Sequence, residues 1–220
     1  MNVELFKKEG YIVIENFISK KDVQIIKDIC YSIKQSIIQN NLIGKEKDFG
    51  IPIYWRGVEM ASTQSPILYK YYTSQKMYDI SSQLLETDDV YLFNDQIVVK
   101  LPHEEFNFSI HTDNSLGPNN DMALNGKFKT ITSCLVLDDF TNDNGPISIL
   151  NKRTKNWDTP LAKKGDLVVW DGNTFHKSEN NNSNVERSVW LCVYSTIDLT
   201  SIETNTGDLY KRFYNKKFTI

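Results

Sequence analysis

Two segments far apart in the chain contain the side chains best suited to bind a metal ion. One is His111-Thr112-Asp113, which follows the strand-like run Phe108–Ile110, and the other is His176. On an extended backbone, residues i and i+2 project from the same face, so the His111 imidazole and the Asp113 carboxylate can converge on one point. His176 follows the apolar run Leu167–Trp170, and a strand that turns at Asp171-Gly172 can deliver a second imidazole to that point.

Two imidazoles and one carboxylate on one side of a metal form the facial triad of non-haem Fe(II) oxygenases. This triad leaves three coordination positions open, two for a chelating keto acid and one for dioxygen. A His-x-Asp triplet also occurs by chance in many proteins, and the same three ligands with a water form a catalytic zinc site. Two alternatives therefore stay open, a zinc hydrolase and a non-catalytic jelly-roll protein that binds a metal or a small ligand.

Arg187 begins the run Arg187–Tyr194, whose apolar residues are typical of a buried strand. A guanidinium at the mouth of a buried strand loses hydration and needs an anionic partner. It can hold a carboxylate in a bidentate, charge-assisted pair, which suits the distal carboxylate of 2-oxoglutarate. Spacing alone leaves equally open a surface arginine at a strand end. An ion pair of Arg187 with Asp166, Asp171 or Glu179 also stays open.

The composition excludes several classes of protein. The chain of 220 residues suits one domain with a full hydrophobic core. Its net charge of -3 gives no basic surplus for a nucleic-acid partner. Three widely spaced cysteines, Cys30, Cys134 and Cys192, argue against a disulfide framework and a thiolate zinc site.

The expected partner is a small-molecule substrate, and the oligomeric state does not follow from the sequence. No apolar run of about 18 residues is present to span a bilayer, so no membrane partner is expected. The first residues also contain no apolar core of a signal peptide, and we expect a cytoplasmic location.

The first part of the chain has mostly helical patterns. Short-range periodicity predicts a helix over Leu5–Gly10, a strand over Tyr11–Ile14 and a long amphipathic helix over about 20–40. Ser19 is expected to cap the long helix, with Asp22 three residues on. Apolar residues between Pro66 and Glu86 again have helical spacing.

From Val90 onward, short strand-like runs alternate with turn residues rich in Gly, Pro and Asn. The predicted strands are Val90–Lys100, Phe108–His111, Thr130–Leu137, Ile147–Leu150, Leu167–Trp170 and Ser188–Thr196. Such spacing indicates an antiparallel sandwich or barrel, with the jelly roll among the candidates. Helices followed by strands give an α+β order, in which the helices pack on one face of the sheet.

Several motifs in a fixed order resemble one known family. They are Phe6–Ser19, Asp95–Pro102, His111-Thr112-Asp113, Leu137–Pro146, Gly165–Gly172, His176-Lys177-Ser178 and Arg187. In this order they are similar to the phytanoyl-CoA dioxygenase (PhyH-like) family of Fe(II)/2-oxoglutarate-dependent oxygenases. Leu150–Thr154 departs from the pattern, because the family usually has a Pro-Gly-Ser-His turn there.

The resemblance implies a mainly β fold, a double-stranded β-helix (jelly roll, cupin-like) buttressed by N-terminal helices. Residues 1–220 would form a single oxygenase domain, with a mostly helical buttress over 1–89 and a jelly-roll core over 90–200. Iron would be bound by His111, Asp113 and His176, with no catalytic residue beyond these ligands.

The resemblance also implies how the co-substrate is bound. Arg187 would bind the C5 carboxylate of 2-oxoglutarate, and Ser178 would add a hydroxyl contact. Gln96 and Lys100 are candidates to reach the co-substrate or the substrate, although Lys100 is equally well explained as an exposed lysine at a strand end.

The expected reaction is hydroxylation of an unactivated C–H bond with dioxygen, releasing succinate and CO2. Related iron halogenases replace the carboxylate ligand with a small residue, so an intact Asp113 favours hydroxylation. Tyr54-Trp55-Arg56, together with Asn94 and Gln96, are expected to line the mouth of the substrate site. Arg56 among aromatic residues suits a carboxylated substrate such as a free amino acid, while core packing is the alternative for Tyr54 and Trp55.

Overall fold

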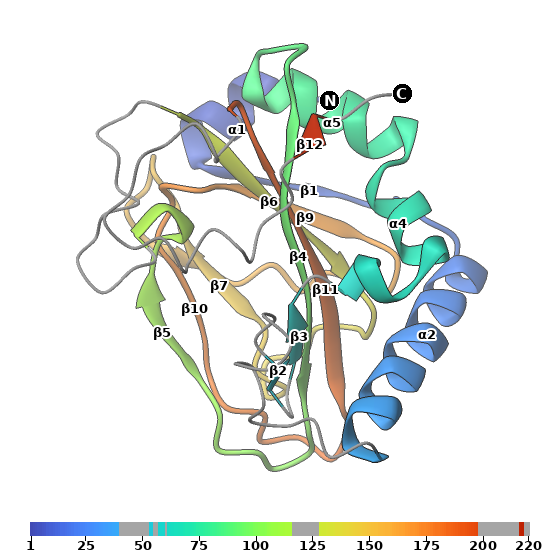
Figure 1. Ribbon diagram of the computed structural model, residues 1–220. Helices are drawn as coiled ribbons and strands as arrows, with labels where there is room; N and C mark the ends of the chain where they lie inside the picture. The colour runs from blue at the N-terminus through green and yellow to red at the C-terminus, as the bar shows by residue number, and fades with distance from the viewer. Residues whose placement is uncertain (40–52, 55–56, 60, 116–127, 198–215, 218–220) are drawn as a thin grey trace.

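The computed structural model describes residues 1–39, 53–54, 57–59, 61–115, 128–197 and 216–217. Within these residues, antiparallel strands form two sheets, and helices cover one of them (Figure 1). The helices in this part of the chain all lack the combination of length and apolar character that crossing a membrane would require.

The larger sheet has the strand order β1-β9-β6-β11-β4-β3-β2, and β12 pairs with β4. Its strands are β1 (Tyr11–Ile14), β2 (Ile53–Tyr54), β3 (Gly57–Glu59), β4 (Tyr91–Lys100), β6 (Thr130–Val136), β9 (Leu167–Asp171), β11 (Arg187–Ser195) and β12 (Lys216–Lys217). The two longest, β4 and β11, pair over their whole length and form the centre of the sheet.

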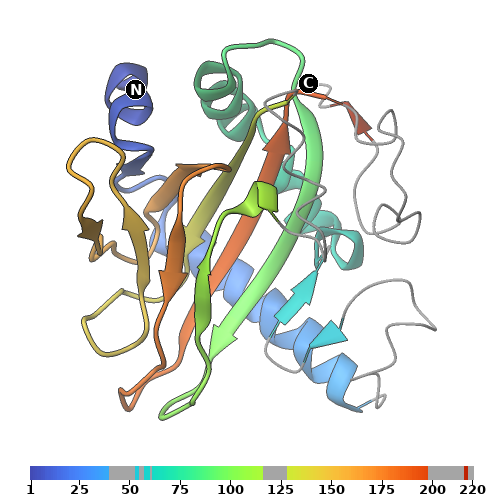
Figure 2. The ribbon, with the colours of Figure 1, turned by 90° about the vertical axis from the view of Figure 1, so that its left-hand side faces the viewer.

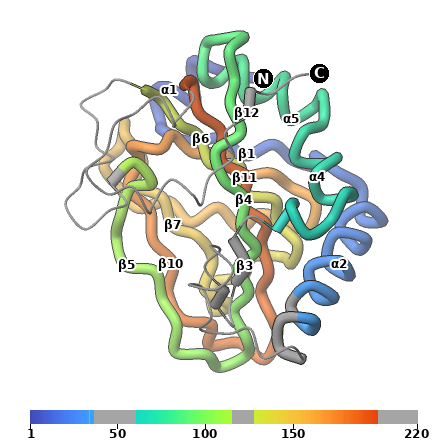
Figure 3. The backbone as a smooth tube through the Cα atoms, in the orientation of Figure 1, coloured from blue at the N-terminus to red at the C-terminus, as the bar shows by residue number. Residues whose placement is uncertain are grey.

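The smaller sheet has the order β5-β10-β7-β8 and lies across from the larger one (Figure 2). Its strands are β5 (Phe108–His111), β7 (Ile147–Leu150), β8 (Trp157–Asp158) and β10 (His176–Ser178). The tube view shows β5, β10 and β7 running beside one another, opposite β4 and β11 (Figure 3).

The side chains of the larger sheet alternate between two hydrophobic clusters, as the period of two in a β-strand requires. On β11, Trp190, Cys192 and Tyr194 pack with the helices. Val189 of the same strand packs between the sheets, with Ile147 of β7. The larger sheet therefore has a helix face and an inner face, and the inner face looks toward the smaller sheet.

Helices cover the helix face, and the first of them begins at Val3, two residues before the predicted Leu5. They are α1 (Val3–Glu9), α2 (Lys20–Gln39), η1 (Ala61–Gln64), α4 (Pro66–Tyr72) and α5 (Gln75–Leu85). The Ser19 hydroxyl accepts a hydrogen bond from the Asp22 amide at 3.1 Å, which confirms the expected cap of α2. The stretch between Pro66 and Glu86 forms two helices, because Ser74 caps a new helix by accepting from the Met77 amide at 3.4 Å.

The structure confirms the expected fold, a mainly β jelly roll buttressed by N-terminal helices, and its sheets do not close into a barrel. Every strand predicted from the sequence is present, with bounds that differ by at most one residue. Five short strands of the described residues, β2, β3, β8, β10 and β12, were not predicted. Each is two or three residues long, too short for an alternating pattern to be recognised.

Candidate metal centre

The two imidazoles of the predicted ligand set lie opposite each other in the smaller sheet. His111 is the last residue of β5 and His176 is the first of β10, and the two are paired in register. Their ring centroids are 4.2 Å apart. Strand pairing therefore brings together two histidines that are far apart in the sequence.

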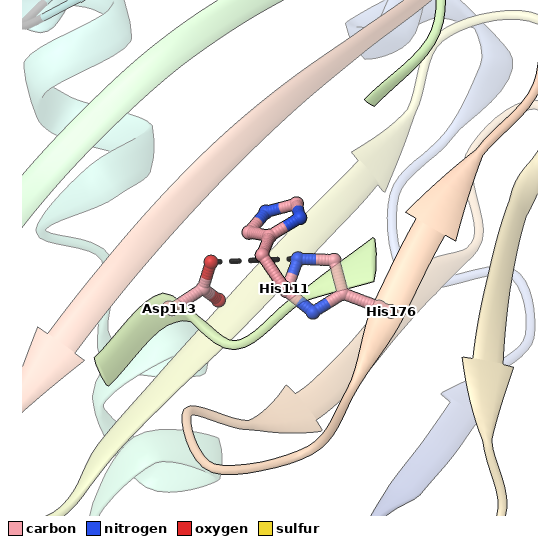
Figure 4. Close-up of side chains that lie close together, drawn as sticks. All are labelled: His111, Asp113 and His176. Atoms are coloured by element: carbon pink, nitrogen blue, oxygen red, sulfur yellow. Dashed lines mark ion pairs between the residues drawn. The ribbon is translucent and has the colours of Figure 1, made fainter. Parts of the chain in front are cut away.

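Asp113 completes the group, although the extended backbone expected for it is wrong. Strand β5 ends at His111, and Asp113 begins the short 3-10 helix η2 (Asp113–Ser115). The Asn114 amide turns to bond the Gly172 carbonyl at 3.1 Å, which ends the extended conformation. The ligand atoms of His111, Asp113 and His176 still lie within 4.8 Å of one another (Figure 4).

Backbone carbonyls determine which nitrogen of each imidazole is free. The His111 Nδ1 lies 2.7 Å from the Ser109 carbonyl oxygen, and the His176 Nδ1 lies 3.1 Å from that of Thr174. A carbonyl oxygen can only accept, so both Nδ1 atoms carry the hydrogen. This leaves both Nε2 lone pairs available to a metal, the arrangement typical of metal-binding histidines.

The Asp113 carboxylate has one oxygen engaged by the protein and one directed at the histidines. Its Oδ2 accepts hydrogen bonds from the Thr132 hydroxyl at 2.5 Å and the Trp170 indole at 2.8 Å. Its Oδ1 lies 3.4 Å from the His176 Nε2 (Figure 4). The carboxylate is thus oriented to offer a single oxygen to a metal.

Electrostatics keep this carboxylate ionised. Burial by itself raises the pKa of Asp113, but the neighbouring His176, when it is charged, and the hydrogen bonds from Thr132 and Trp170 outweigh burial and lower it. For His111, burial and then the His176 charge lower the pKa, which favours the neutral ring. For His176, burial lowers the pKa, while the stronger combined effect of Asp113 and the Thr174 carbonyl raises it.

Arg187, the first residue of β11, is only 1% exposed and has no ionic partner among the described residues. Its Nη2 donates to the Gly145 carbonyl at 2.7 Å, and its Nε has no hydrogen-bond partner. Burial lowers its pKa to about 10. A buried guanidinium with an unpaired N–H fits an anionic ligand.

The other interpretations of Arg187 are wrong. It is buried, so it is not a surface residue at a strand end. The three carboxylates considered as partners bind elsewhere. Asp166 accepts from the amides of Asn16 and Lys163, Asp171 pairs with Lys152, and Glu179 pairs with Lys177.

Lys100 is a second buried cation directly across from Arg187 in the β4–β11 pair. Its Nζ donates to the Ser178 hydroxyl at 2.8 Å and to the Glu179 carbonyl. Burial and next the charge of Arg187 lower its pKa to about 7. Lys100 is therefore not the exposed lysine of the alternative interpretation, and Ser178 lies beside it.

Of the remaining candidate residues, the structure describes the side chains of only two, Asn94 and Gln96. Asn94 and Gln96 lie two residues apart on β4, so both side chains point toward the inner face. Asn94 is buried and Gln96 is half-buried. Trp55 and Arg56 lie outside the described residues. Tyr54 is described only as the backbone of β2.

Sequence reasoning missed three kinds of residue around this centre. Thr132 and Trp170 orient Asp113, and both are inner-face residues of predicted strands. Phe106 and Phe108 place their rings 5.9 and 5.7 Å from the Lys100 Nζ.

Gly145 holds Arg187 through its carbonyl and was noted only as part of a motif. It has a φ of 66°, and a Cβ there would collide with the Glu179 carbonyl oxygen. Its place in an Asn-Gly-Pro turn is the one sequence signal that was available.

Comparisons with known proteins point to one enzyme family. The family model of phytanoyl-CoA dioxygenase (PhyH) matches residues 6–189. No curated protein matches the chain.

Several solved structures have the same fold. The alpha-ketoglutarate-dependent carbocyclase SnoK from nogalamycin biosynthesis is 17% identical, with a TM-score of 0.71 over 91% of this chain and 89% of its own. EctD from S. alaskensis, solved with 2-oxoglutarate and 5-hydroxyectoine, is 18% identical, with a TM-score of 0.70 over 87% and 74%. The non-heme monooxygenase ThoJ, a nickel complex, is 13% identical, with a TM-score of 0.69 over 87% and 76%. At these identities the likeness shows the fold alone.

Proposed function

The chain belongs to the phytanoyl-CoA dioxygenase (PhyH) family of Fe(II)/2-oxoglutarate-dependent oxygenases. We propose that it hydroxylates a C–H bond of a small metabolite, using an iron ion bound by His111, Asp113 and His176. The observation that carries the proposal is that a group of metal ligands and a buried arginine without an ionic partner among the described residues occur in the same jelly roll. Three ligand atoms are available on one side of a single point. A buried guanidinium without a carboxylate partner lies on the inner face of the same jelly roll.

The donor set fits Fe(II). Two neutral imidazole nitrogens and one carboxylate oxygen are the ligands of the facial triad, with positions left for other ligands. The backbone bonds to both Nδ1 atoms and the two donors on the Asp113 Oδ2 pre-orient the ligands, as supporting contacts do in metal sites. When bound, Fe(II) with 2-oxoglutarate and dioxygen would supply the oxidant for an unactivated C–H bond, releasing succinate and CO2.

Arg187, Lys100 and Ser178 fit the far carboxylate of 2-oxoglutarate. Arg187 would hold the C5 carboxylate, because its Nε–H is buried and unpaired. Lys100, on the neighbouring strand, and Ser178 beside it would add an ammonium and a hydroxyl contact. An anion between the two cations would also favour the charged form of Lys100, which Arg187 now disfavours.

The substrate we propose is an amino acid or another carboxylated small molecule. Arg56, with Tyr54 and Trp55, would contact its carboxylate, and Gln96 would contact either the substrate or the co-substrate.

We further propose that residues 1–220 form one oxygenase domain, with a helical buttress over 1–89 and a jelly-roll core over 90–200. We propose that the protein has no nucleic-acid partner, because its net charge is acidic. We also propose a cytoplasmic location.

The test is an anaerobic titration of the metal-free protein with Fe(II) and 2-oxoglutarate, followed by visible absorbance. The wild type should develop a weak metal-to-ligand charge-transfer band that requires both components. His176→Ala should lose the band because it removes a ligand, and Arg187→Ala should develop it only at much higher 2-oxoglutarate concentration. Lys177→Ala, a change beside His176 on a side chain that pairs with Glu179, is the matched control and should keep the band.

Two outcomes would contradict the proposal. If no band forms while zinc binds tightly at the same histidines, the site is that of a hydrolase or of a binding protein. If the band forms but no substrate ever increases succinate production, a non-catalytic binding protein is the better description.

A further inference from the structure

Asn94 lies on the inner face of the larger sheet, at the same level as Thr132, which orients the metal ligand Asp113. In the strand register Asn94 pairs with Val193 of β11, and Val193 pairs with Thr132 of β6. Thr132 is the residue whose hydroxyl binds Asp113. Two strand spacings separate the backbones of Asn94 and Thr132, roughly 10 Å.

The side chain of Asn94 faces the space between the sheets. Side chains of β4 alternate, and Val98, four residues along, belongs to the cluster between the sheets. The backbone of Asn94 is held firmly, because its carbonyl accepts from the Tyr72 hydroxyl at 2.9 Å in addition to the strand pairing. The side chain is therefore carried on a rigid element at the centre of the sheet.

This side chain is buried, 8% exposed, yet its Oδ1 has no hydrogen-bond partner. Four other asparagines of the described residues that are buried accept a hydrogen bond with Oδ1; they are Asn114, Asn144, Asn151 and Asn181. The Oδ1 of the half-buried Asn180 and the Oγ of Ser133 are also unpaired, but neither side chain lies on the inner face near Thr132. An unpaired buried acceptor destabilises a fold and is rarely kept without a reason. A group that the fold leaves unpaired beside a reactive centre is best explained by a ligand.

We propose that Asn94 binds the substrate and that the substrate carries a hydroxyl or amino group close to the carbon that reacts. The inference rests on the proposed function, which supplies the metal and its co-substrate, and it narrows the substrate class. A saturated acyl chain in this position would leave the Asn94 amide unpaired, and a site built for a hydrogen bond rejects analogues that lack it. The substrate is thus a compact polar molecule, with Leu191 and Val193 of β11 giving the site an apolar side.

The first test needs no substrate. Replacing Asn94 by Leu removes an unpaired acceptor, so the Tm of the metal-free protein should stay the same or rise by up to about 4 °C. The matched control is Asn181→Leu, the same change at a buried asparagine whose amide makes hydrogen bonds to Lys100, Val185 and Ser183. The control should lower the Tm. If Asn94→Leu lowers the Tm as much as Asn181→Leu, Asn94 has a structural partner and the proposal is overturned.

The second test measures the substrate class through 2-oxoglutarate consumption. One pool contains free amino acids, amino alcohols and small polyols, and the other contains C8–C16 fatty acids and their CoA thioesters. The polar pool should raise consumption above the rate without substrate, and Asn94→Leu should lose that increase by roughly 10- to 100-fold. Stimulation by the acyl pool alone, or by neither pool, overturns the inference. Failure of the proposed function looks different, because the wild type would then either lack the charge-transfer band or respond to neither pool, whereas stimulation by the acyl pool alone overturns only the inference.

Discussion

Asp95 and Asp113 are carboxylates on opposite sides of the larger sheet, and each accepts a hydrogen bond from a tryptophan indole at 2.8 Å. Asp95 lies on the helix face, fully buried. Its Oδ1 accepts from the Ser62 hydroxyl at 2.7 Å, and its Oδ2 accepts from the Ser62 amide and the Trp190 indole. Asp113 has two donors on Oδ2, and its Oδ1 is directed at His176.

The difference between these two aspartates separates a structural carboxylate from a metal ligand. Both are surrounded by the same kinds of donor, a hydroxyl and an indole, so local composition does not distinguish them. At Asp95 both oxygens are bound by donors of the protein. At Asp113 the donors gather on one oxygen and leave the other beside two free imidazole nitrogens.

Removing each carboxylate gives the largest effects and the sharpest contrast. Asp113→Ala should abolish the charge-transfer band and succinate production in a protein that still folds, although the Thr132 hydroxyl and the Trp170 indole lose their acceptor. Asp95→Ala should keep the band but leave buried donors of Ser62 and Trp190 unpaired, at a cost of about 3 kcal/mol. Thermal unfolding, followed by circular dichroism, should then show a Tm lower by roughly 10 °C. An Asp95 variant that keeps its Tm but loses iron would reverse the two assignments.

Of the two aspartates, only Asp113 should be needed for metal binding to stabilise the protein. At a concentration 100 times its Kd, Fe(II) or Mn(II) stabilises the folded state by about 2.7 kcal/mol. For a chain of this size the Tm should rise by roughly 5 to 10 °C in the wild type. The same rise is expected in Asp95→Ala, from a lower starting Tm, and none in Asp113→Ala. A chelator should return each protein to its metal-free Tm.

Replacing the two tryptophans tests the same comparison by removing one hydrogen-bond donor from each aspartate and keeping the carboxylate. Trp170→Phe removes one donor from the Asp113 Oδ2, so metal affinity should fall by about 10- to 100-fold with a small change in Tm. Trp190→Phe should leave metal affinity unchanged and destabilise the fold by about 1 to 3 kcal/mol. Metal titration and thermal unfolding give the metal affinity and the Tm of each variant. Equal losses of affinity in the two would show that the indole bonds act only through general packing.

The smallest effects are expected from the hydroxyl donors. Thr132→Val keeps the shape of the side chain and removes the second donor to Asp113, which should weaken metal binding by about 2- to 10-fold. Ser62→Ala removes the hydroxyl bond to Asp95 and should lower the Tm by about 2 to 4 °C without changing metal affinity. The comparison loses its basis if Ser62→Ala weakens metal binding as much as Thr132→Val does.

Much of the fold could be predicted because its signals are local. The alternation in β4 and β11, the cap at Ser19 and the turn residues between strands each depend on residues a few positions apart. Strand β10 escaped prediction because three residues carry no period, and the break at Thr73-Ser74 escaped because the apolar spacing continues across it. Tertiary contacts decide both.

The candidate site divides in the same way. Histidine is scarce in this chain, so the His-x-Asp triplet and His176 could be singled out by residue type and spacing. Spacing left the environment of Arg187 undecided between solvent, an ion pair and a ligand. The fold buries it beside Gly145 and pairs every carboxylate considered for it with another residue.

The sequence by itself determined the chemical types available to the site, two imidazoles, a carboxylate, a guanidinium and an ammonium, and the strands that carry them. Only the tertiary structure decided which groups are satisfied and which remain open. At the proposed site the open groups are the Asp113 Oδ1, the Arg187 Nε and the Asn94 Oδ1, and the described residues also leave the Ser133 Oγ and the Asn180 Oδ1 unpaired. The physical reason is that hydrogen-bond satisfaction depends on donors and acceptors brought together across strands and sheets, from positions up to 164 residues apart.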